Sequence, residues 1–359
     1  MQAAVIATCL GTMPHPQFIL RNLMQKQEEI TMFIWKTGIL SILASVAFAT
    51  TVQAEDITMR LHTLVKSPHP YNDMAAFMAE EISDRSNGEI TIKIFDAAQL
   101  GKDDTVIGEM GLGTIDLMIS STNNAAKKVP EFQIFSMPYL FAGFEDLMEK
   151  VGPDTAAEAY FQGKFADYSL NMQLLALGGS GTRNLANSVG PVNALADISG
   201  FKMRTPPSPM ISKTWAELGT LPSTVAWAEL YAAVQTGVVE ALESSIPGYS
   251  GAKLYEVAPF LSLTAHTIQV NHISMSDRAW GKLSDGQQEM FVAVAQEATL
   301  LGIARAKQYE VDLVAKLAAD NNVTVTRPDT AEFRAALSDL NVSLVEELGL
   351  QEPMAALNN

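Results

Sequence analysis

Two arginines, Arg183 and Arg204, stand close together in the stretch 181–207, which reads GTRNLANSVGPVNALADISGFKMRTPP and holds mostly small, uncharged residues. The planar guanidinium of arginine can hold a carboxylate through two parallel hydrogen bonds. The pair could therefore bind an acid in a shared cleft. The alternative is that both are surface arginines that pair with acidic neighbours, because the chain as a whole carries a formal charge of −16.

Other patterns that could do chemistry are weak. The sequence contains no HExxH, GxSxG or CxxC motif. The histidines of the exported part are not spaced as metal ligands; they are His62, His69, His266 and His272. The GGSG run at 178–181 lacks the Lys-Ser/Thr of a phosphate loop, and we interpret it as a turn after a strand. We therefore expect no metal, no cofactor and no catalytic residue, although a triad assembled in three dimensions stays open.

The elements before residue 122 follow a strand–helix–strand–helix–strand order. Apolar patterns predict strands over 57–65, 89–95 and 114–120, with helices between them that end at Gly88 and near Gly113. This order is typical of a parallel sheet with crossover helices. In such sheets, ligands bind beyond the carboxyl ends of the strands.

The same pattern restarts further along the chain. It predicts a strand over 172–178, a second over 200–206, a helix over 227–237 and a strand over 238–245. We interpret these as a second α/β unit with its own sheet. Arg183 would follow a strand and its glycine turn, and Arg204 would end the next strand, so both could reach one cleft.

A long helical segment follows the second unit. Ser284 and Gln287 form a capping box. From there to about Asn321 there is no proline and only Gly302 interrupts the segment, which predicts one long helix or two abutting ones.

Composition limits the classes of partner. The chain has 359 residues, is 48% hydrophobic and is acidic. We expect no nucleic-acid partner and no anionic membrane partner, because both require basic patches. A local site for a small anion is compatible with the acidic total.

The N-terminal region predicts export. From Met32 the sequence reads MFIWKTGILSILASVAFATTVQAED, with Lys36 before an apolar run and small residues up to Ala54. The run is short for a membrane span of ~20 residues. We therefore predict that 1–54, an upstream segment plus a signal peptide, is removed by cleavage after Ala54 and that the protein is periplasmic. The only cysteine, Cys9, lies in the removed part, so no disulfide is expected.

Several motifs together resemble one known family, the solute-binding subunits of tripartite ATP-independent periplasmic (TRAP) transporters, of the four-carbon-dicarboxylate-binding type. The matching stretches include NGEITIKIFDAAQLG, GLGTIDLMISST, VPEFQIFSMPYLF, GTRNLAN, ISGFKMRTPPSP, VAWAELYAAVQTGVVEALES and KLYEVAPFLSLTAH, and the resemblance covers nearly all of 57–349. It implies two α/β lobes joined by crossing strands and a long helix, with the cleft between them closing on a carboxylate ligand. We place lobe 1 at 55–180 and 271–305, and lobe 2 at 181–270 and 306–350.

The resemblance also assigns roles to residues. It implies that Arg204 is the principal carboxylate clamp, that Arg183 is a second ligand-binding arginine, and that Trp227 packs on the ligand. The neutral neighbours of the two arginines would then keep competing carboxylates away. The implied partners are a small-molecule organic acid and the membrane permease subunits of a TRAP transporter, and we expect a monomer.

The sequence departs from the family at places that bear on the ligand. Many members carry QEN where this chain has LESS, so Ser244 replaces the usual amide. The sialic-acid-binding branch has a Glu and an Arg near the positions of Ser121 and Asn124. These two residues, with Asp103, Tyr249 and His69, are candidate polar wall residues; the alternative is that they are ordinary loop polars.

The ligand itself stays open among sugar acids, keto or hydroxy acids, aromatic acids and dicarboxylates. The main expectation is an extracytoplasmic solute-binding protein that catalyses no reaction. The alternative is a periplasmic enzyme that acts on a carboxylated substrate in the same cleft. Presentation of the ligand to a sensor protein is a further role, and it does not exclude the others.

Overall fold

The computed structural model describes residues 56–320 and 322–359. The predicted upstream segment, signal peptide and cleavage site lie outside these residues. None of the helices in the described part is both long enough and apolar enough to cross a membrane.

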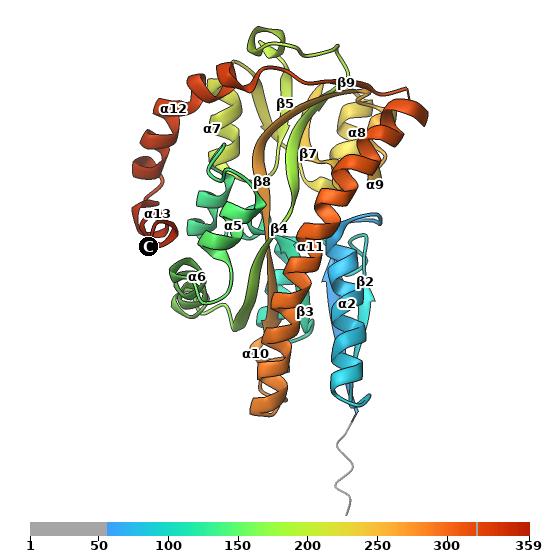
Figure 1. Ribbon diagram of the computed structural model, residues 1–359, viewed down its shortest axis with the longest axis vertical. Helices are drawn as coiled ribbons and strands as arrows, with labels where there is room; N and C mark the ends of the chain where they lie inside the picture. Colours follow the sequence, from blue (N-terminus) through green and yellow to red (C-terminus); the bar gives the residue numbers. More distant parts are fainter. Residues whose placement is uncertain (1–55, 321) are drawn as a thin grey trace, which may run out of the picture. The chain divides into compact units, whose positions relative to one another are not determined.

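The described strands form one continuous sheet rather than the two sheets that the sequence predicted. Its order is β2-β1-β3-β8-β4-β7-β5-β6, and β9 pairs with β8. The strands are β1 (Ile57–Thr63), β2 (Ile90–Phe95), β3 (Leu117–Ser121), β4 (Met172–Asn187), β5 (Lys202–Thr205), β6 (Leu221–Thr224), β7 (Ala241–Ser245), β8 (Phe260–Ser276) and β9 (Thr324–Thr326). The prediction failed because β4 and β8, with 16 and 17 residues, pair with each other and join both ends of the sheet (Figure 1).

The predicted parallel units are nevertheless present at the two ends. β1 pairs in parallel with β2 and β3 at one end, and β5 pairs in parallel with β6 and β7 at the other. The long strands β4 and β8 run antiparallel to each other and to their outer neighbours β7 and β3.

The glycine run 178–181 is not a turn, because β4 continues through it. A side chain at Gly178 would come within 2.6 Å of Thr299 on the long helix, so glycine is required for close packing rather than for reversal of the chain. The pairing register with β8 shifts between Gly179 and Thr182, and Gly181 has a φ of 134°. The run is therefore an irregular crossing in a continuous strand.

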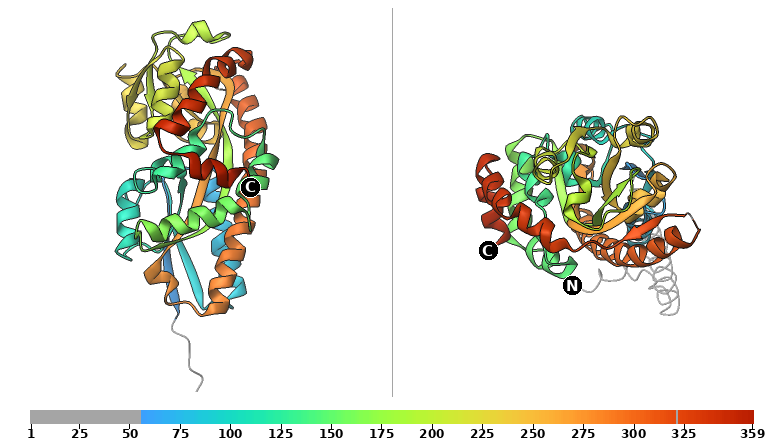
Figure 2. Two further views of the ribbon diagram at one scale, coloured as in Figure 1. Left: turned by 90° about the vertical axis from the view of Figure 1, so that its left-hand side faces the viewer. Right: turned by 90° about the horizontal axis from the view of Figure 1, so that it is seen from above.

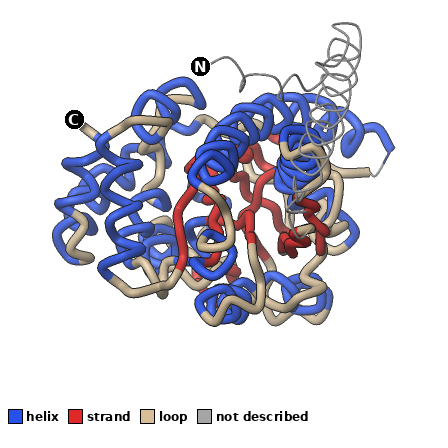
Figure 3. Tube along the Cα trace, turned by 90° about the horizontal axis from the view of Figure 1, so that it is seen from below, coloured by secondary structure: helices blue, strands red, loops and turns tan. Residues whose placement is uncertain are grey.

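Helices cover the sheet, whose strands lie in the centre when the molecule is seen from below (Figure 3). They are α2 (Pro70–Arg85), α3 (Asp103–Gly111), α4 (Thr122–Ala125), α5 (Phe144–Val151), α6 (Ala156–Asp167), α7 (Pro209–Glu217), α8 (Leu230–Gln235), α9 (Ile246–Gly251), α10 (Asp277–Trp280), α11 (Asp285–Asp320), α12 (Thr330–Glu347) and α13 (Gln351–Leu357). Short 3-10 turns are η1 (Pro130–Ser136), η2 (Leu195–Ile198), η3 (Trp227–Glu229) and η4 (Leu254–Glu256).

The long helix is one piece. α11 has 36 residues and begins at the predicted capping box, in which Ser284 N–H donates to Gln287 Oε1 at 3.0 Å and Gln287 N–H donates to Ser284 Oγ at 3.4 Å. It lies alongside β4 and α2 and extends to α9 (Figure 1). One rigid element thus accompanies the crossing strands.

Buried apolar side chains gather at both ends of the sheet. One cluster packs β1, β3 and α2 against α11 and includes Leu61, Met74, Ile119 and Phe291. Another packs β7, α8 and α9 against α11 and includes Leu242, Ile246, Tyr249 and Leu313. The two ends lie at opposite ends of the long strands (Figure 2). This arrangement agrees with a two-lobe fold, and the exact lobe boundaries stay a prediction.

Candidate functional site

One cavity collects residues from both ends of the sheet. Its volume is about 40 Å³. By the same measure, a cavity that holds one water molecule needs roughly 10–15 Å³. Its lining residues are Leu64, Val65, His69, Tyr71, Asp103, Ser121, Asn123, Asn124, Arg183, Arg204, Pro206, Trp227, Ser244, Ser245, Gly248 and Gln269. Eight of the nine predicted site residues are among them; the exception is Tyr249.

Arg204 is a buried cation whose hydrogen-bonding capacity is largely unused. It lies in β5, at the carboxyl end of the strand as predicted, and is 2% exposed. Its Nε–H donates to the carbonyl of Val225 at 2.9 Å, and among the described residues it forms no other hydrogen bond and no ion pair. Burial lowers the pKa of Arg204 to about 10, and the negative charge of Glu243 offsets part of this effect. Arg204 is therefore a cation at neutral pH.

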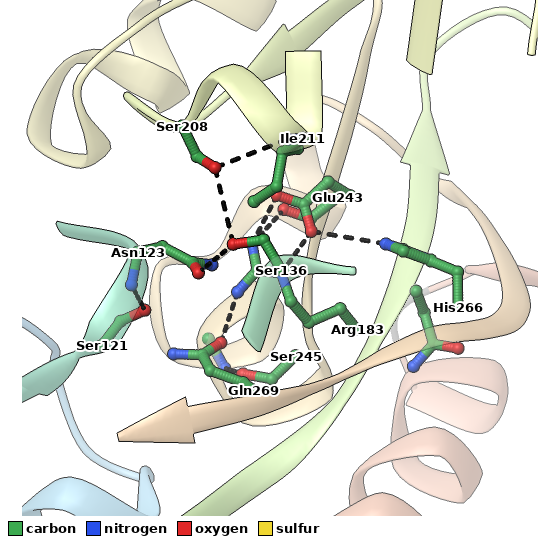
Figure 4. A network of polar contacts seen from close by, with 12 residues as sticks. Ser121, Asn123, Ser136, Arg183, Ser208, Ile211, Glu243, Ser245, His266 and Gln269 are labelled. Carbon is green, nitrogen blue, oxygen red and sulfur yellow. Dashed lines mark hydrogen bonds and ion pairs between the residues drawn. The ribbon is translucent and has the colours of Figure 1, made fainter. Parts of the chain in front are cut away.

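Arg183 is equally buried but is fully engaged by the protein. It lies within β4 rather than after a turn, between Glu243 on β7 and Gln269 on β8 (Figure 4). Its Nε and Nη2 donate to the two carboxylate oxygens of Glu243, the second at 2.6 Å, and Nη1 donates to Gln269 Oε1. Nη2 also donates to the carbonyl of Glu243 at 3.0 Å.

Glu243 corrects the expectation of neutral surroundings. The stretch around the arginines is poor in acids, but the fold brings this buried glutamate to Arg183 from a strand 60 residues away. Burial raises the pKa of Glu243, but the charges and hydrogen bonds of Arg183 and His266 outweigh burial and hold it well below its usual range. The carboxylate is therefore ionised and forms its ion pair with Arg183, whereas Arg204 has no ion-pair partner among the described residues.

Trp227 and Ser244 form one wall beside Arg204. The guanidinium carbon of Arg204 lies 5.8 Å from the centre of the Trp227 ring, within cation–π range. A Cβ placed on Gly248 would come within 2.8 Å of Ser244 Oγ and 3.3 Å of the Trp227 ring. Glycine at this position therefore lets α9 approach the cavity, and a side chain there would clash with this wall.

Asp103 organises a polar cluster on the opposite wall. Its Oδ1 lies 3.0 Å from His62 Nε2, and its Oδ2 accepts from Ser120 Oγ and, at 2.8 Å, from Asn124 Nδ2. Asp103 begins α3, and Ser120 lies on β3. Ser121, the last residue of that strand, accepts from the N–H of Asn123 and keeps its own hydroxyl proton for another partner.

His69 is a neutral hydrogen-bond donor. It caps α2, and its Nδ1 accepts from the N–H of Tyr71 at 3.2 Å, which leaves the ring proton on Nε2. Burial, with a contribution from the charge of Arg183, lowers its pKa to about 3. Beside it, the hydroxyl of Tyr71 accepts from Gln269 Nε2 at 2.8 Å.

Tyr249 is not a wall residue. Its ring belongs to the apolar cluster of α8 and α9, and its hydroxyl donates to the carbonyl of Ala258 at 2.7 Å. On α9 the Tyr249 ring points into the core, and Gly248 of the same helix lines the cavity instead.

Three important residues were missed from the sequence: Glu243, Gln269 and Tyr71. Glu243 carried a usable signal, because an acid inside an apolar strand must find a cation when the strand is buried. Gln269 lies in a strand that the sequence pattern had not predicted. No pattern in the sequence singled out Tyr71.

The arrangement is suited to binding rather than to bond cleavage. It offers a free buried guanidinium, several neutral donors and an apolar aromatic wall. Among residues 56–320 and 322–359, no three His, Cys, Asp or Glu side chains are grouped in a way that could hold a metal ion.

Comparisons with known proteins agree with this description. The family model described as bacterial extracellular solute-binding protein, family 7 (DctP), matches residues 61–347. A relative from Sinorhizobium fredii, the uncharacterized protein y4mM, is 28% identical over 327 residues, or 90% of this chain. The chain spans 60% of the length of that relative.

Two solved structures are similar in fold. A TRAP periplasmic solute-binding protein from Polaromonas sp. JS666, bound to D-erythronate, is 27% identical with a TM-score of 0.78. One from Roseobacter denitrificans, with bound β-D-glucuronate, is 26% identical with a TM-score of 0.76. Each comparison covers 84% of this chain and 98% of the solved chain.

Proposed function

The chain belongs to family 7 of the bacterial extracellular solute-binding proteins, and from this premise we propose that it captures a sugar acid by the carboxylate, at Arg204, and delivers it to a TRAP permease. Members of this family are solute-binding proteins of TRAP transporters and not enzymes, which favours the carrier over the enzyme that the sequence left open. The predicted four-carbon-dicarboxylate type stays a prediction.

One observation carries the proposal. Arg204 is 2% exposed, lines the cavity and has no ion-pair partner among the described residues. An unpaired buried charge is costly, and proteins keep such a charge mainly where a ligand completes it. The free terminal nitrogens of a guanidinium match the two oxygens of a carboxylate.

The remaining wall favours a hydroxylated acid. Ser121, Ser244 and His69 present neutral donors to the cavity, and Trp227 presents an aromatic face. Hydroxyl groups use such donors, and a carbon skeleton covers an aromatic ring well. The acids bound to the two similar solved structures, D-erythronate and β-D-glucuronate, are of this chemical class.

The screen that tests this function is a thermal shift against a library of acids at pH 7. The library contains aldonates, uronates, keto acids, aromatic acids, succinate and malate. An acid present at 100 times its dissociation constant should add about 2.7 kcal/mol of stability. We expect the largest shifts from sugar acids. A library in which no acid raises the melting temperature would contradict the proposal.

Recovery of the ligand separates the carrier from the enzyme. After prolonged incubation the protein is denatured, and the released acid is identified by mass spectrometry. A carrier returns the acid unchanged. A product of different mass, formed in step with protein concentration, would support the enzyme instead.

Delivery to the membrane follows from the family. The TRAP solute-binding family is periplasmic, and we infer that this chain passes its ligand to permease subunits in the membrane. The predicted cleavage after Ala54 and the monomeric state are part of the proposal. Mass spectrometry of the exported protein should give a chain that begins at Glu55, and light scattering should give the mass of one chain.

A further inference from the structure

The cavity holds a negative charge as well as the free arginine. Of its sixteen lining residues, Asp103 is the one acid. Glu243, the other buried carboxylate of the site, lies behind Arg183 and is paired with it. Asp103 is 4% exposed, and among the described residues its one ion-pair contact is with His62 Nε2 at 3.0 Å, with no lysine or arginine beside it.

The direct partners of Asp103 donate hydrogen bonds but include no lysine or arginine. Ser120 and Asn124 donate to one carboxylate oxygen, and His62 Nε2 donates to the other. The charge of Asp103 acts beyond these partners, since it adds to burial in raising the pKa of Tyr71, another residue of the cavity, to about 12.

The fixed charges at the site therefore balance before any ligand enters. Arg204 and Arg183 contribute two positive charges, and Glu243 and Asp103 contribute two negative ones. A ligand with one carboxylate can place it on Arg204. A second carboxylate, displaced from that arginine, would face Asp103 in a water-poor site, where repulsion between like charges is strongest.

We propose that Asp103 is the residue that excludes diacids, so that the ligand is a monocarboxylate with hydroxyl groups at the end remote from Arg204. The inference deepens the proposed function and rests on it. A ligand hydroxyl donates to the unused lone pairs of Asp103 or to Asn124 Oδ1, because an amide oxygen accepts hydrogen bonds and the Nδ2 of the same amide already donates to Asp103. The same hydroxyl accepts from Ser121 or from His69 Nε2.

Matched acids test the inference. D-erythronate and meso-tartrate differ only at C4, where a CH₂OH group is replaced by a carboxylate, and D-gluconate and D-glucarate differ in the same way at C6. Affinities of the purified protein for all four are measured by calorimetry. In at least one pair the monoacid should bind about 100-fold more tightly than its diacid, as expected for a like charge in a buried site.

Substitution then assigns the selectivity to Asp103. In Asp103→Asn the ratio of monoacid affinity to diacid affinity should fall at least tenfold, because this variant should bind the diacid more tightly than the unmodified protein does. A gain of affinity for the diacid is not expected from mere damage to the fold. The control is Asp104→Asn, which removes the same charge from an exposed neighbour on α3 that does not line the cavity. Asp104→Asn should keep the preference of the unmodified protein for the monoacid.

The contrary outcomes are distinct. Equal binding of monoacid and diacid in both pairs, tighter binding of the diacid in both pairs, or an unchanged preference in a folded Asp103→Asn protein would overturn the role of Asp103. Binding of none of the four acids would also overturn it. In that case the thermal-shift screen decides separately whether the proposed function fails too, since a shift by any other acid preserves it.

Discussion

Arg183 and Arg204 line one cavity and are buried to a similar degree, yet the protein treats them differently. Arg183 donates to Glu243 and Gln269 through all three of its nitrogens, whereas Arg204 donates once, to a backbone carbonyl. The first arginine is part of the wall, and its charge is already neutralised. The second is a buried charge without an ion-pair partner among the described residues. We therefore expect the unused hydrogen-bond donors of an arginine, rather than its burial or its place beside a cavity, to indicate which one binds the ligand.

The largest expected effect is on stability. Arg183→Met should lower the free energy of unfolding by about 3–5 kcal/mol, because it leaves Glu243 buried without its main partner. Urea unfolding of the ligand-free protein measures this. The control is the double variant Arg183→Met/Glu243→Leu, which removes both charges and should recover most of the loss. A single variant as stable as the unmodified protein would mean that the pair has no structural role.

The next effect is on affinity. Arg204→Lys should weaken binding of the tightest acid by about 2–5 kcal/mol, or very roughly 30- to several-thousand-fold. Lysine keeps the charge and loses the bidentate geometry, so the loss should approach that of Arg204→Ala. Calorimetry measures the affinity, with circular dichroism as the folding control. Near-normal binding by a folded Arg204→Lys protein would reduce Arg204 to a diffuse positive charge.

A smaller effect appears on acidification. Burial, with a contribution from the charge of Arg183, lowers the pKa of His69 from 6.5 to about 3. Between these two values His69 is protonated in the unfolded chain and neutral in the folded protein. Stability should therefore be complete above pH 6.5 and fall as the pH drops below it, by about 2 kcal/mol between pH 7 and 5 from this residue. His69→Gln should remove that part of the loss in urea unfolding at the two pH values. Identical pH dependence in both proteins would contradict it.

The smallest effect concerns an exposed ion pair. Lys102 Nζ lies 2.6 Å from Glu229 Oε1, with the two side chains 57% and 59% exposed. The pair joins the N-cap of α3 to η3, and neither residue lines the cavity. Surface pairs contribute about 0–1 kcal/mol. Lys102→Ala should weaken ligand binding by no more than this, and the difference should vanish in 1 M salt. A loss as large as that of Arg204→Lys would make this exposed ion pair as important for affinity as the buried arginine.

The sequence predicted the parts of the fold that local pattern controls. The capping box located the start of α11, and the parallel units at the two ends of the sheet appeared as expected. It could not show that β4 and β8 join these units into one sheet. That pairing connects residues 73 to 104 positions apart. Gly178 and Gly179 of β4, in the run that was interpreted as a turn, allow close contact with α11.

In the candidate site, too, the sequence predicted what local motifs indicate and missed what depends on distant residues. Motif resemblance pointed to Arg204, Arg183 and Trp227, and all three line the cavity. The difference between the arginines was invisible, because the partner of Arg183 comes from another strand. Tyr249 was misplaced because a sequence position near a cleft does not determine which way a side chain on a short helix points.

A crystal structure of the protein with the tightest-binding acid of the screen would show directly whether Arg204 holds the ligand. We expect the ligand carboxylate on the two terminal nitrogens of Arg204, at about 2.7–2.9 Å, with the Arg183–Glu243 pair intact. A carboxylate bound to Arg183 with Glu243 displaced, or a ligand without contact to Arg204, would contradict it.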